Sequence, residues 1–177
     1  MNELERQRWN IDFDVAKSIR YHAYRRSFWD QAYNISKILT VISGAAVLVS
    51  IIGANNPVAT AFAFAVAITS ALDVVLGFSN RSRAHDGLYR AFSRLAQDIS
   101  ENAAPTATDI TDWHRRRLEI EMDEPGVIDW LERRCSAEEA AARGVTIRPE
   151  WQLRPWQIWL SQLAMWPSIP RGSHPQH

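Results

Sequence analysis

Five histidines and one cysteine are the residues of this sequence best suited to metal or nucleophilic chemistry. The histidines stand at positions 22, 85, 114, 174 and 177, and they do not recur with Cys135, Asp or Glu at the intervals typical of metal ligands or catalytic groups. We therefore expect no catalytic residue, no metal and no cofactor, and the sequence does not predict an enzyme. The single cysteine also excludes an internal disulfide framework.

Lys37 and Asp73 border the longest uncharged stretch of the chain, residues 38–72. If that stretch crosses a membrane, placing an unpaired Lys37 or Asp73 side chain near hydrocarbon costs free energy. The two residues lie almost equally far from Asn55-Asn56, so at about 1.5 Å per helical residue they reach nearly the same depth. We expect an ion pair between them, within one chain or between neighbouring copies. The alternative is that both side chains snorkel to the membrane interface.

The uncharged stretch predicts two transmembrane helices joined as a hairpin. Residues 38–54 and 58–78 each approach the roughly 20 residues that cross a bilayer. Between them, Asn55-Asn56-Pro57 is a turn signal, and proline suits the first position of the second helix. The alternative is a buried helical hairpin in a soluble protein, but the rest of so short a chain offers little surface to cover two apolar helices.

The flanks of the hairpin predict its orientation. Basic residues precede it (Lys17, Arg20, Arg25, Arg26 and Lys37) and follow it (Arg81, Arg83, Arg90 and Arg94), whereas the loop carries no charge. By the positive-inside rule both termini are expected in the cytoplasm. Phe28, Trp29 and Tyr33 lie just before the first span and are expected to anchor it at the interface. The formal net charge is +0, which does not favour a nucleic-acid partner.

Two rows of small or polar residues run along the predicted spans. On the first helix, an arc of about 80° holds a polar stripe: Ser36, Thr40, Ser43 and Ser50. On the second, positions alternating by four and three form a seam of mostly small residues with Asp73 in it: Ala59, Ala63, Val66, Ser70 and Gly77. Both rows suit close helix packing or the lining of a water-filled pore.

The sequence thus predicts an all-α membrane protein with three parts: a cytoplasmic amphipathic helix (1–34), the transmembrane hairpin (35–78) and a cytoplasmic helical region (79–177). We expect helices near 12–33 and 80–102, the latter extending the membrane helix, with its apolar face at Leu88, Phe92, Leu95 and Ile99. Further helices are expected at 109–122 and 127–134, followed by a separate one after Ser136 with a capping box to Glu139 and Gly144 at its C-cap.

The C-terminal part contains four tryptophans within sixteen positions: Trp151, Trp156, Trp159 and Trp166. Pro155 is placed to begin a helix in this segment. Such a segment can close the small domain, lie on the membrane surface or stack on a ligand. Because it lacks a basic face, closure of the domain is the favoured interpretation.

Short motifs around the hairpin resemble a known family. RYHAYRR (20–26) precedes the hairpin, His85 and Leu88-Tyr89 follow it, and EPGVIDWLERRC (124–135) comes later. Over roughly residues 9 to 135, the order of these parts is similar to that of the SLATT family, two-transmembrane effectors of bacterial defence systems. The Trp-rich C-terminus is not part of that pattern, and we expect no appended nucleotide-binding domain.

The resemblance implies an oligomeric pore-forming effector of the bacterial inner membrane that permeabilises this membrane in anti-phage defence, an abortive infection. Its implied partners are membrane lipid, further copies of the same chain, and a companion sensor protein or nucleotide signal as trigger. The alternative is a prophage-type membrane anchor whose cytoplasmic lobe binds a protein partner without forming a pore.

Overall fold

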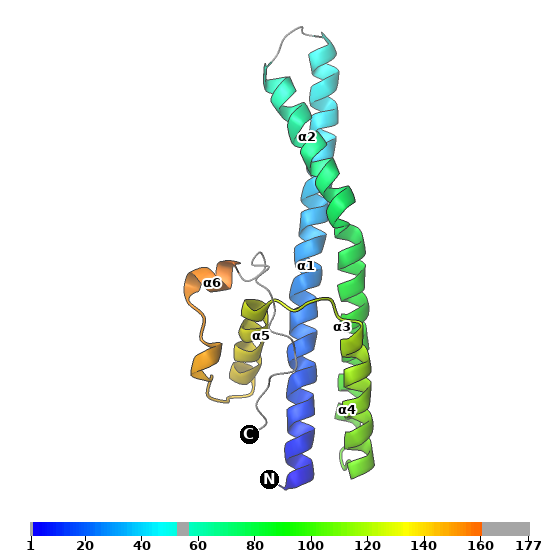
Figure 1. Ribbon diagram of the computed structural model, residues 1–177, viewed down its shortest axis with the longest axis vertical. Coiled ribbons are helices and arrows are strands. Elements are labelled where there is room, and N and C mark those ends of the chain that lie inside the picture. The colour runs from blue at the N-terminus through cyan, green and yellow to red at the C-terminus, as the bar shows by residue number, and fades with distance from the viewer. Residues whose placement is uncertain (1, 53–56, 161–177) are drawn as a thin grey trace. The chain divides into compact units, whose positions relative to one another are not determined.

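The computed structural model describes residues 2–52 and 57–160, and this part of the chain is all-helical, with no strand. The predicted all-α class is confirmed. The elements follow one another along the chain as shown in Figure 1: α1 (Glu3–Ile52), α2 (Pro57–Leu76), α3 (Phe78–Glu101), α4 (Ala107–Met122), α5 (Asp129–Ala142), the short 3-10 helix η1 (Pro149–Trp151) and α6 (Pro155–Leu160).

The chain divides into two compact units whose boundaries fall inside α1 and α3. The first unit comprises Met1–Tyr24 and His85–His177, and the second comprises Arg25–Ala84. The first unit therefore combines most of the N-terminal segment with most of the C-terminal region, which the sequence analysis treated as two parts. The second unit contains the predicted hairpin with residues 25–34 before it and residues 79–84 after it.

The core of the first unit forms along one face of α3. Leu88, Phe92, Leu95 and Ile99 are all buried, as their spacing of four and three predicts. The last three pack with apolar residues of α1 and α4 in one cluster: Ile11, Val15, Phe92, Leu95, Ile99, Ile110 and Trp113. Helix α3 is therefore amphipathic: one face packs in the core, and the opposite face carries the charged residues.

Helix α5 attaches to α1 through a second apolar cluster and several ion pairs. Tyr21 of α1 packs with Ile128, Leu131 and Cys135, and Tyr21 Oη accepts a hydrogen bond from the Ile128 amide. Burial raises the pKa of the Cys135 thiol to about 12. The thiol is therefore protonated at neutral pH, and its role is packing.

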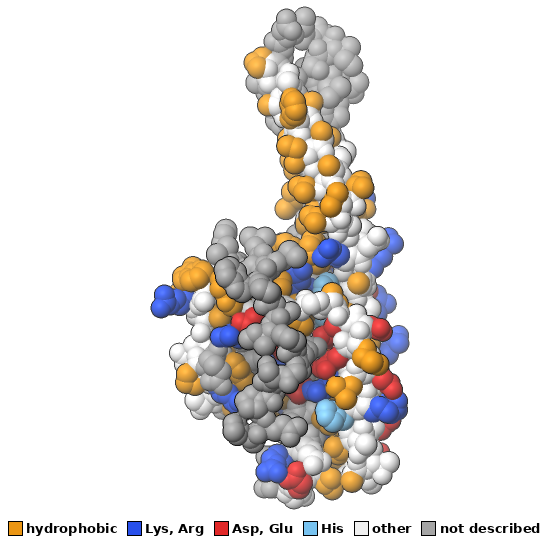
Figure 2. All heavy atoms as spheres, in the orientation of Figure 1, with side chains coloured by type: hydrophobic (Ala, Val, Ile, Leu, Met, Phe, Trp, Pro, Cys, Tyr) orange, Lys and Arg blue, Asp and Glu red, His pale blue; other side chains and the backbone are white. Residues whose placement is uncertain are grey.

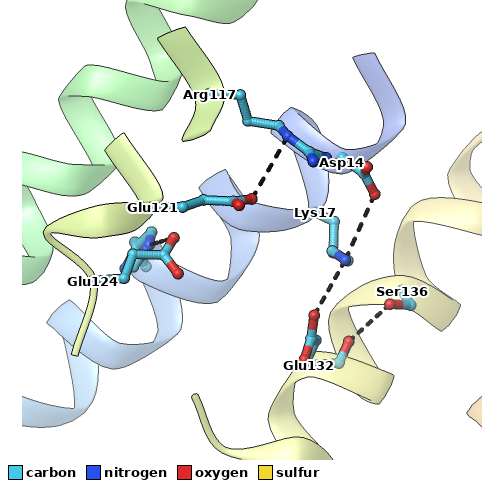
Figure 3. Close-up of polar contacts among 8 residues, drawn as sticks. Asp14, Lys17, Arg117, Glu121, Glu124, Glu132 and Ser136 are labelled. Carbon is cyan, nitrogen blue, oxygen red and sulfur yellow. Dashed lines mark hydrogen bonds and ion pairs between the residues drawn. The ribbon is translucent and has the colours of Figure 1, made fainter. Parts of the chain in front are cut away.

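Charged residues lie along the same helix pair. Lys17 Nζ is 3.6 Å from Asp14 and 3.2 Å from Glu132 of α5, and Asp14 also pairs with Arg117 of α4 (Figure 3). These contacts tie α4 and α5 to α1, and they are partly buried, which makes them less screened than surface pairs.

Glu139 of α5 is buried and binds two arginines. Its carboxylate accepts hydrogen bonds from Arg20 of α1 and Arg143, each at 2.7 Å. Burial opposes ionisation of Glu139, but the two hydrogen bonds outweigh it and lower the pKa of the carboxyl. This residue joins α1 to the end of α5.

The expected helix break before Ser136 was wrong, because α5 is continuous from Asp129 to Ala142. No Gly or Pro interrupts this stretch, and the Ser136 hydroxyl donates to the Glu132 carbonyl of the preceding turn instead of capping a new helix. The expected C-terminal signal is confirmed: Gly144 follows the helix with φ of +67°, a conformation that favours glycine.

A capping box does form, at a different place. Thr106 and Asp109 exchange side-chain and backbone hydrogen bonds at the start of α4, which begins at Ala107, close to the predicted start. Helix α1 begins at Glu3, earlier than expected, and α6 begins at Pro155 as expected. The hydrogen bonds to Thr106 lower the pKa of Asp109.

The second unit holds the end of α1, all of α2 and the first turns of α3. Pro57 is the first residue of α2, as predicted. The membrane helix continues into residues 80–102, as predicted, with a local irregularity at Gly77, which adopts φ of +59° between α2 and α3. Hydrogen bonds from the Gly77 amide to Asp73 and from the Arg81 amide to Gly77 nevertheless continue the helical ladder through this point.

Candidate functional site

The surface of the second unit exposes apolar side chains on both of its long helices. Val41 on α1 is 74% exposed, and Val74 and Val75 on α2 are 85% and 78% exposed. Other exposed members of the same surface are Ile35, Ile38, Ile42, Phe64, Ile68 and Leu72. Apolar side chains gather over α2 on the face drawn in Figure 2.

This surface is costly in water. Moving one Val, Leu, Ile or Phe side chain out of water is worth about 1.5 to 3 kcal/mol. The exposed set together is therefore comparable with the whole stability of a typical domain, about 5 to 15 kcal/mol. A contiguous patch of this kind marks a surface that contacts another protein or a membrane.

Among the described residues, one helical stretch is long and apolar enough to cross a membrane. It lies within Ala63–Glu101, and only 6% of its most apolar window is buried. A core helix of a soluble protein would be mostly buried, and a signal sequence would lie near the N-terminus. Helix α2 has 20 residues, which at about 1.5 Å per residue gives about 30 Å, the thickness of the hydrocarbon layer.

The predicted polar stripe is described in part. Ser36 is buried, whereas Thr40 is exposed and its hydroxyl donates to the Ser36 carbonyl at 2.9 Å. Such a bond within the helix satisfies the hydroxyl without a partner helix. The side chains of Ser43 and Ser50 lie outside the described part of the chain.

The predicted seam on α2 is open along most of its described length. Ala63 and Ser70 are exposed, and Val66, Asp73 and Gly77 are partly buried; the side chain of Ala59 is not among those described. Ala63 and Ser70 are therefore available for contact with lipid or with another copy of the chain.

Lys37 and Asp73 do not pair with each other among the described residues. The Lys37 ammonium lies 4.4 Å from the centroid of the Tyr33 ring, a cation–π contact one helical turn away. Both residues are described, and neither takes part in an ion pair within 4.0 Å. A pair between neighbouring copies stays a prediction.

The predicted interface anchors contact arginines and the first turn of α3. Trp29 is buried and stacks on Phe78 with centroids 5.9 Å apart. The Arg25 and Arg81 guanidiniums lie 4.9 and 5.1 Å from the Trp29 ring centroid. Phe28 packs edge-on against Trp29, at 5.0 Å between centroids. Trp29 therefore joins α1 to α3 within the second unit.

In the first unit, the structure brings together two of the histidines that appear scattered in the sequence. His22 Nδ1 lies 3.0 Å from His85 Nδ1, and His22 Nε2 lies 3.0 Å from a Glu124 carboxylate oxygen. The His22 and Glu124 side chains are 1% and 3% exposed, and His22 stacks on Phe92. The cluster links α1, α3 and the segment after α4.

The carboxylate fixes the direction of one hydrogen bond in this cluster. A carboxylate only accepts, so His22 Nε2 donates to Glu124. Between the two Nδ1 atoms, one histidine donates and the other accepts, so His22 and His85 satisfy each other. Within the described residues, no three His, Cys, Asp or Glu side chains are placed to hold a metal ion.

No family model, curated protein or solved structure matches this chain.

A groove of about 670 Å³ runs between α1 and α4 of the first unit. Its apolar lining includes Ile11, Leu118 and Met122, the last of which is 78% exposed. The charged residues that line it are already paired, since Arg115 contacts both Asp112 and Glu119. The groove is thus an apolar surface without an unpaired charge of its own.

Two tryptophans of the C-terminal segment pack against helices of the first unit. Trp151 stacks on Phe13 of α1 with centroids 5.9 Å apart, and Trp156 meets Trp130 of α5 edge-on at 5.5 Å. These contacts agree with closure of the domain. The side chain of Trp159 and all of Trp166 fall outside the described residues.

Proposed function

We propose that this chain is an oligomeric effector of the bacterial inner membrane, inserted as a two-helix hairpin, that permeabilises the membrane in anti-phage defence. The observation that carries the proposal is the exposed apolar surface of α2, where Val74 and Val75 remain open. In the hydrocarbon layer of a membrane, these side chains no longer contact water, so the free-energy cost of exposing them is removed along the whole helix.

The other span of the hairpin, which comes first along the chain, is the end of α1. Exposed Ile38, Val41 and Ile42 support this assignment, together with the absence of charge from 38 to 72. The connection between α1 and α2 is short, so the two helices run in opposite directions within this unit, as Figure 1 illustrates. With basic residues on both flanks, both termini belong on the cytoplasmic side.

Assembly into a pore is supported by the seam on α2. Small residues such as Ala63 and Ser70 let helix backbones approach closely in a membrane, where apolar burial gives no driving force. Their exposure in a single chain leaves the seam available to a second copy. The motifs that resemble the SLATT family, including RYHAYRR at 20–26, favour the defence role.

Induced expression in bacteria tests the proposal. A potential-sensitive dye and an impermeant DNA stain should report depolarisation and then dye entry once the effector is triggered or overproduced. The matched control is the same chain with Val74 and Val75 both changed to Asp, which should prevent insertion because a charge in hydrocarbon costs several kcal/mol. A membrane that stays intact under every triggering condition, with the wild-type protein inserted, would contradict pore formation.

A second candidate is a membrane anchor whose cytoplasmic lobe binds a protein partner. The apolar groove between α1 and α4, with Leu118 and Met122 exposed, favours it. Recovery of one stoichiometric partner in a pull-down, lost when Met122 is changed to Glu, together with no conductance in planar bilayers, would support the anchor over the pore.

A further inference from the structure

Basic residues outnumber acidic ones in the second unit, and they gather near the ends of its apolar surface. Residues 25–84 contain Arg25, Arg26, Lys37, Arg81 and Arg83 against Asp30 and Asp73. Asp30 accepts a hydrogen bond from Ser82 at 2.5 Å. The unit therefore carries an excess of positive charge beside exposed apolar helices.

Arg81 is an exposed cation at the end of the apolar surface of α2. Its Nε donates to the Leu76 carbonyl at 2.8 Å, so the side chain is held at the end of α2. Its guanidinium also lies 5.1 Å from the Trp29 ring centroid. Among the described residues, Arg81 makes no ion pair with a carboxylate, which leaves its charge uncompensated.

Trp29 supplies a second feature at the same place. Its Nε1–H is buried and has no hydrogen-bond acceptor among the described residues. A buried donor without an acceptor costs about 1 to 3 kcal/mol, so a shift of the covering side chains that admits a ligand oxygen to this N–H would be stabilised. Arg25, 4.9 Å from the same ring, adds positive charge from a buried position.

We propose that Arg81 and Trp29 form a binding site for the phosphate of an anionic phospholipid headgroup. The inference rests on the proposed membrane insertion of this unit. A lipid is favoured over free phosphate because exposed Val74 and Val75 lie just before Arg81, so acyl chains joined to the bound phosphate would continue along α2. Arg81 supplies the charge, and the Trp29 N–H supplies a directed donor.

Lipid titration of the full-length protein in mild detergent tests the site. The delipidated protein would be titrated with dioleoyl phosphatidylglycerol, with dioleoyl phosphatidylcholine of the same chain length, and with inorganic phosphate, and native mass spectrometry would count bound lipid. We expect saturable binding of phosphatidylglycerol, and at least fivefold weaker binding of phosphatidylcholine. Arg81→Gln should weaken phosphatidylglycerol binding about fivefold, the effect of one basic side chain at an anionic surface.

Arg83→Gln is the matched control. Arg83 is also an exposed arginine of α3, but residues two apart on a helix do not share a face, so this change should weaken binding less than twofold. Trp29→Phe keeps an aromatic ring against Phe78 and removes only the N–H, and it should weaken phosphatidylglycerol binding several-fold.

The inference fails if the two lipids bind equally well, if Arg83→Gln has the same effect as Arg81→Gln, or if inorganic phosphate competes as well as lipid. Insertion itself is checked separately, by resistance of the protein to carbonate extraction from vesicles of the two lipids. A protein that inserts without preferring phosphatidylglycerol overturns this site alone, whereas a protein that does not insert overturns the proposed function.

Discussion

Changing His22 to Phe should destabilise the first unit although the new side chain has a similar size. Phenylalanine can keep the stacking on Phe92, where the ring centroids are 5.6 Å apart. It can make neither the hydrogen bond to Glu124 nor the one to His85. The first hydrogen bond involves a carboxylate and is worth about 1.5 to 3 kcal/mol, and the second about 0.5 to 1.5 kcal/mol.

The buried apolar ring offsets part of this loss, so we expect a net destabilisation of about 2 to 3 kcal/mol. For a unit of roughly 100 residues, 1 kcal/mol corresponds to about 4 to 8 °C in Tm, which predicts a decrease of about 10 to 20 °C. Thermal unfolding in mild detergent, followed by tryptophan fluorescence, reports this unit through buried Trp113.

His114→Phe is the control, because His114 is exposed on α4. That change should shift Tm by only a few degrees. If His22→Phe is no more destabilising than His114→Phe, the buried hydrogen bonds of His22 contribute nothing net and the argument is refuted.

Three further experiments test other parts of the structure. Because the pKa of Glu139 is lowered by its arginine partners, its contribution to stability is complete above the ordinary value of 4.5 and is lost as the pH falls through the lowered folded value. Glu139→Gln should therefore lower the free energy of unfolding by about 1 to 3 kcal/mol at pH 7, and the resulting Tm difference from wild type should shrink in acid. A constant difference would contradict the assignment. The buried Cys135 thiol, with its pKa raised to about 12, should resist maleimide in the native state and react after denaturation; rapid native labelling would show that it is accessible. Ala63→Leu should weaken self-association on a sizing column, because bulk on the seam separates backbones, while Ala61→Leu on the other side of α2 should not; equal effects would indicate that the seam faces lipid.

Helical periodicity predicted much of the first unit. The spacing of Leu88, Phe92 and Leu95 predicted the buried face of α3, because apolar residues three and four apart lie on one side of a helix and face the core. The same spacing also contains the missed cluster: His85 precedes Leu88 by three, and His22 continues the α1 face of Val15. A histidine at a core position was a signal that the search for metal-ligand intervals overlooked.

Other features depend on contacts between distant residues and could not be read from local sequence. The burial of Glu139 on α5 depends on its pairing with Arg20, far away in the chain. The irregularity at Gly77 depends on one positive φ. Glycine can adopt a positive or a negative φ, so its presence does not by itself predict this conformation. The arrangement of Arg81 around Trp29 likewise requires α3 to return beside α1.

Site-directed labelling tests the central claim, the membrane hairpin, most directly. Single cysteines would replace Asn56 in the loop and Gln152 near the C-terminus, with the buried Cys135 left in place as an unreactive internal control. In spheroplasts with an intact inner membrane, an impermeant maleimide should label the Asn56→Cys protein at once and the Gln152→Cys protein only after permeabilisation. Labelling of both positions from the same side, or recovery of both proteins in the soluble fraction, would contradict the hairpin.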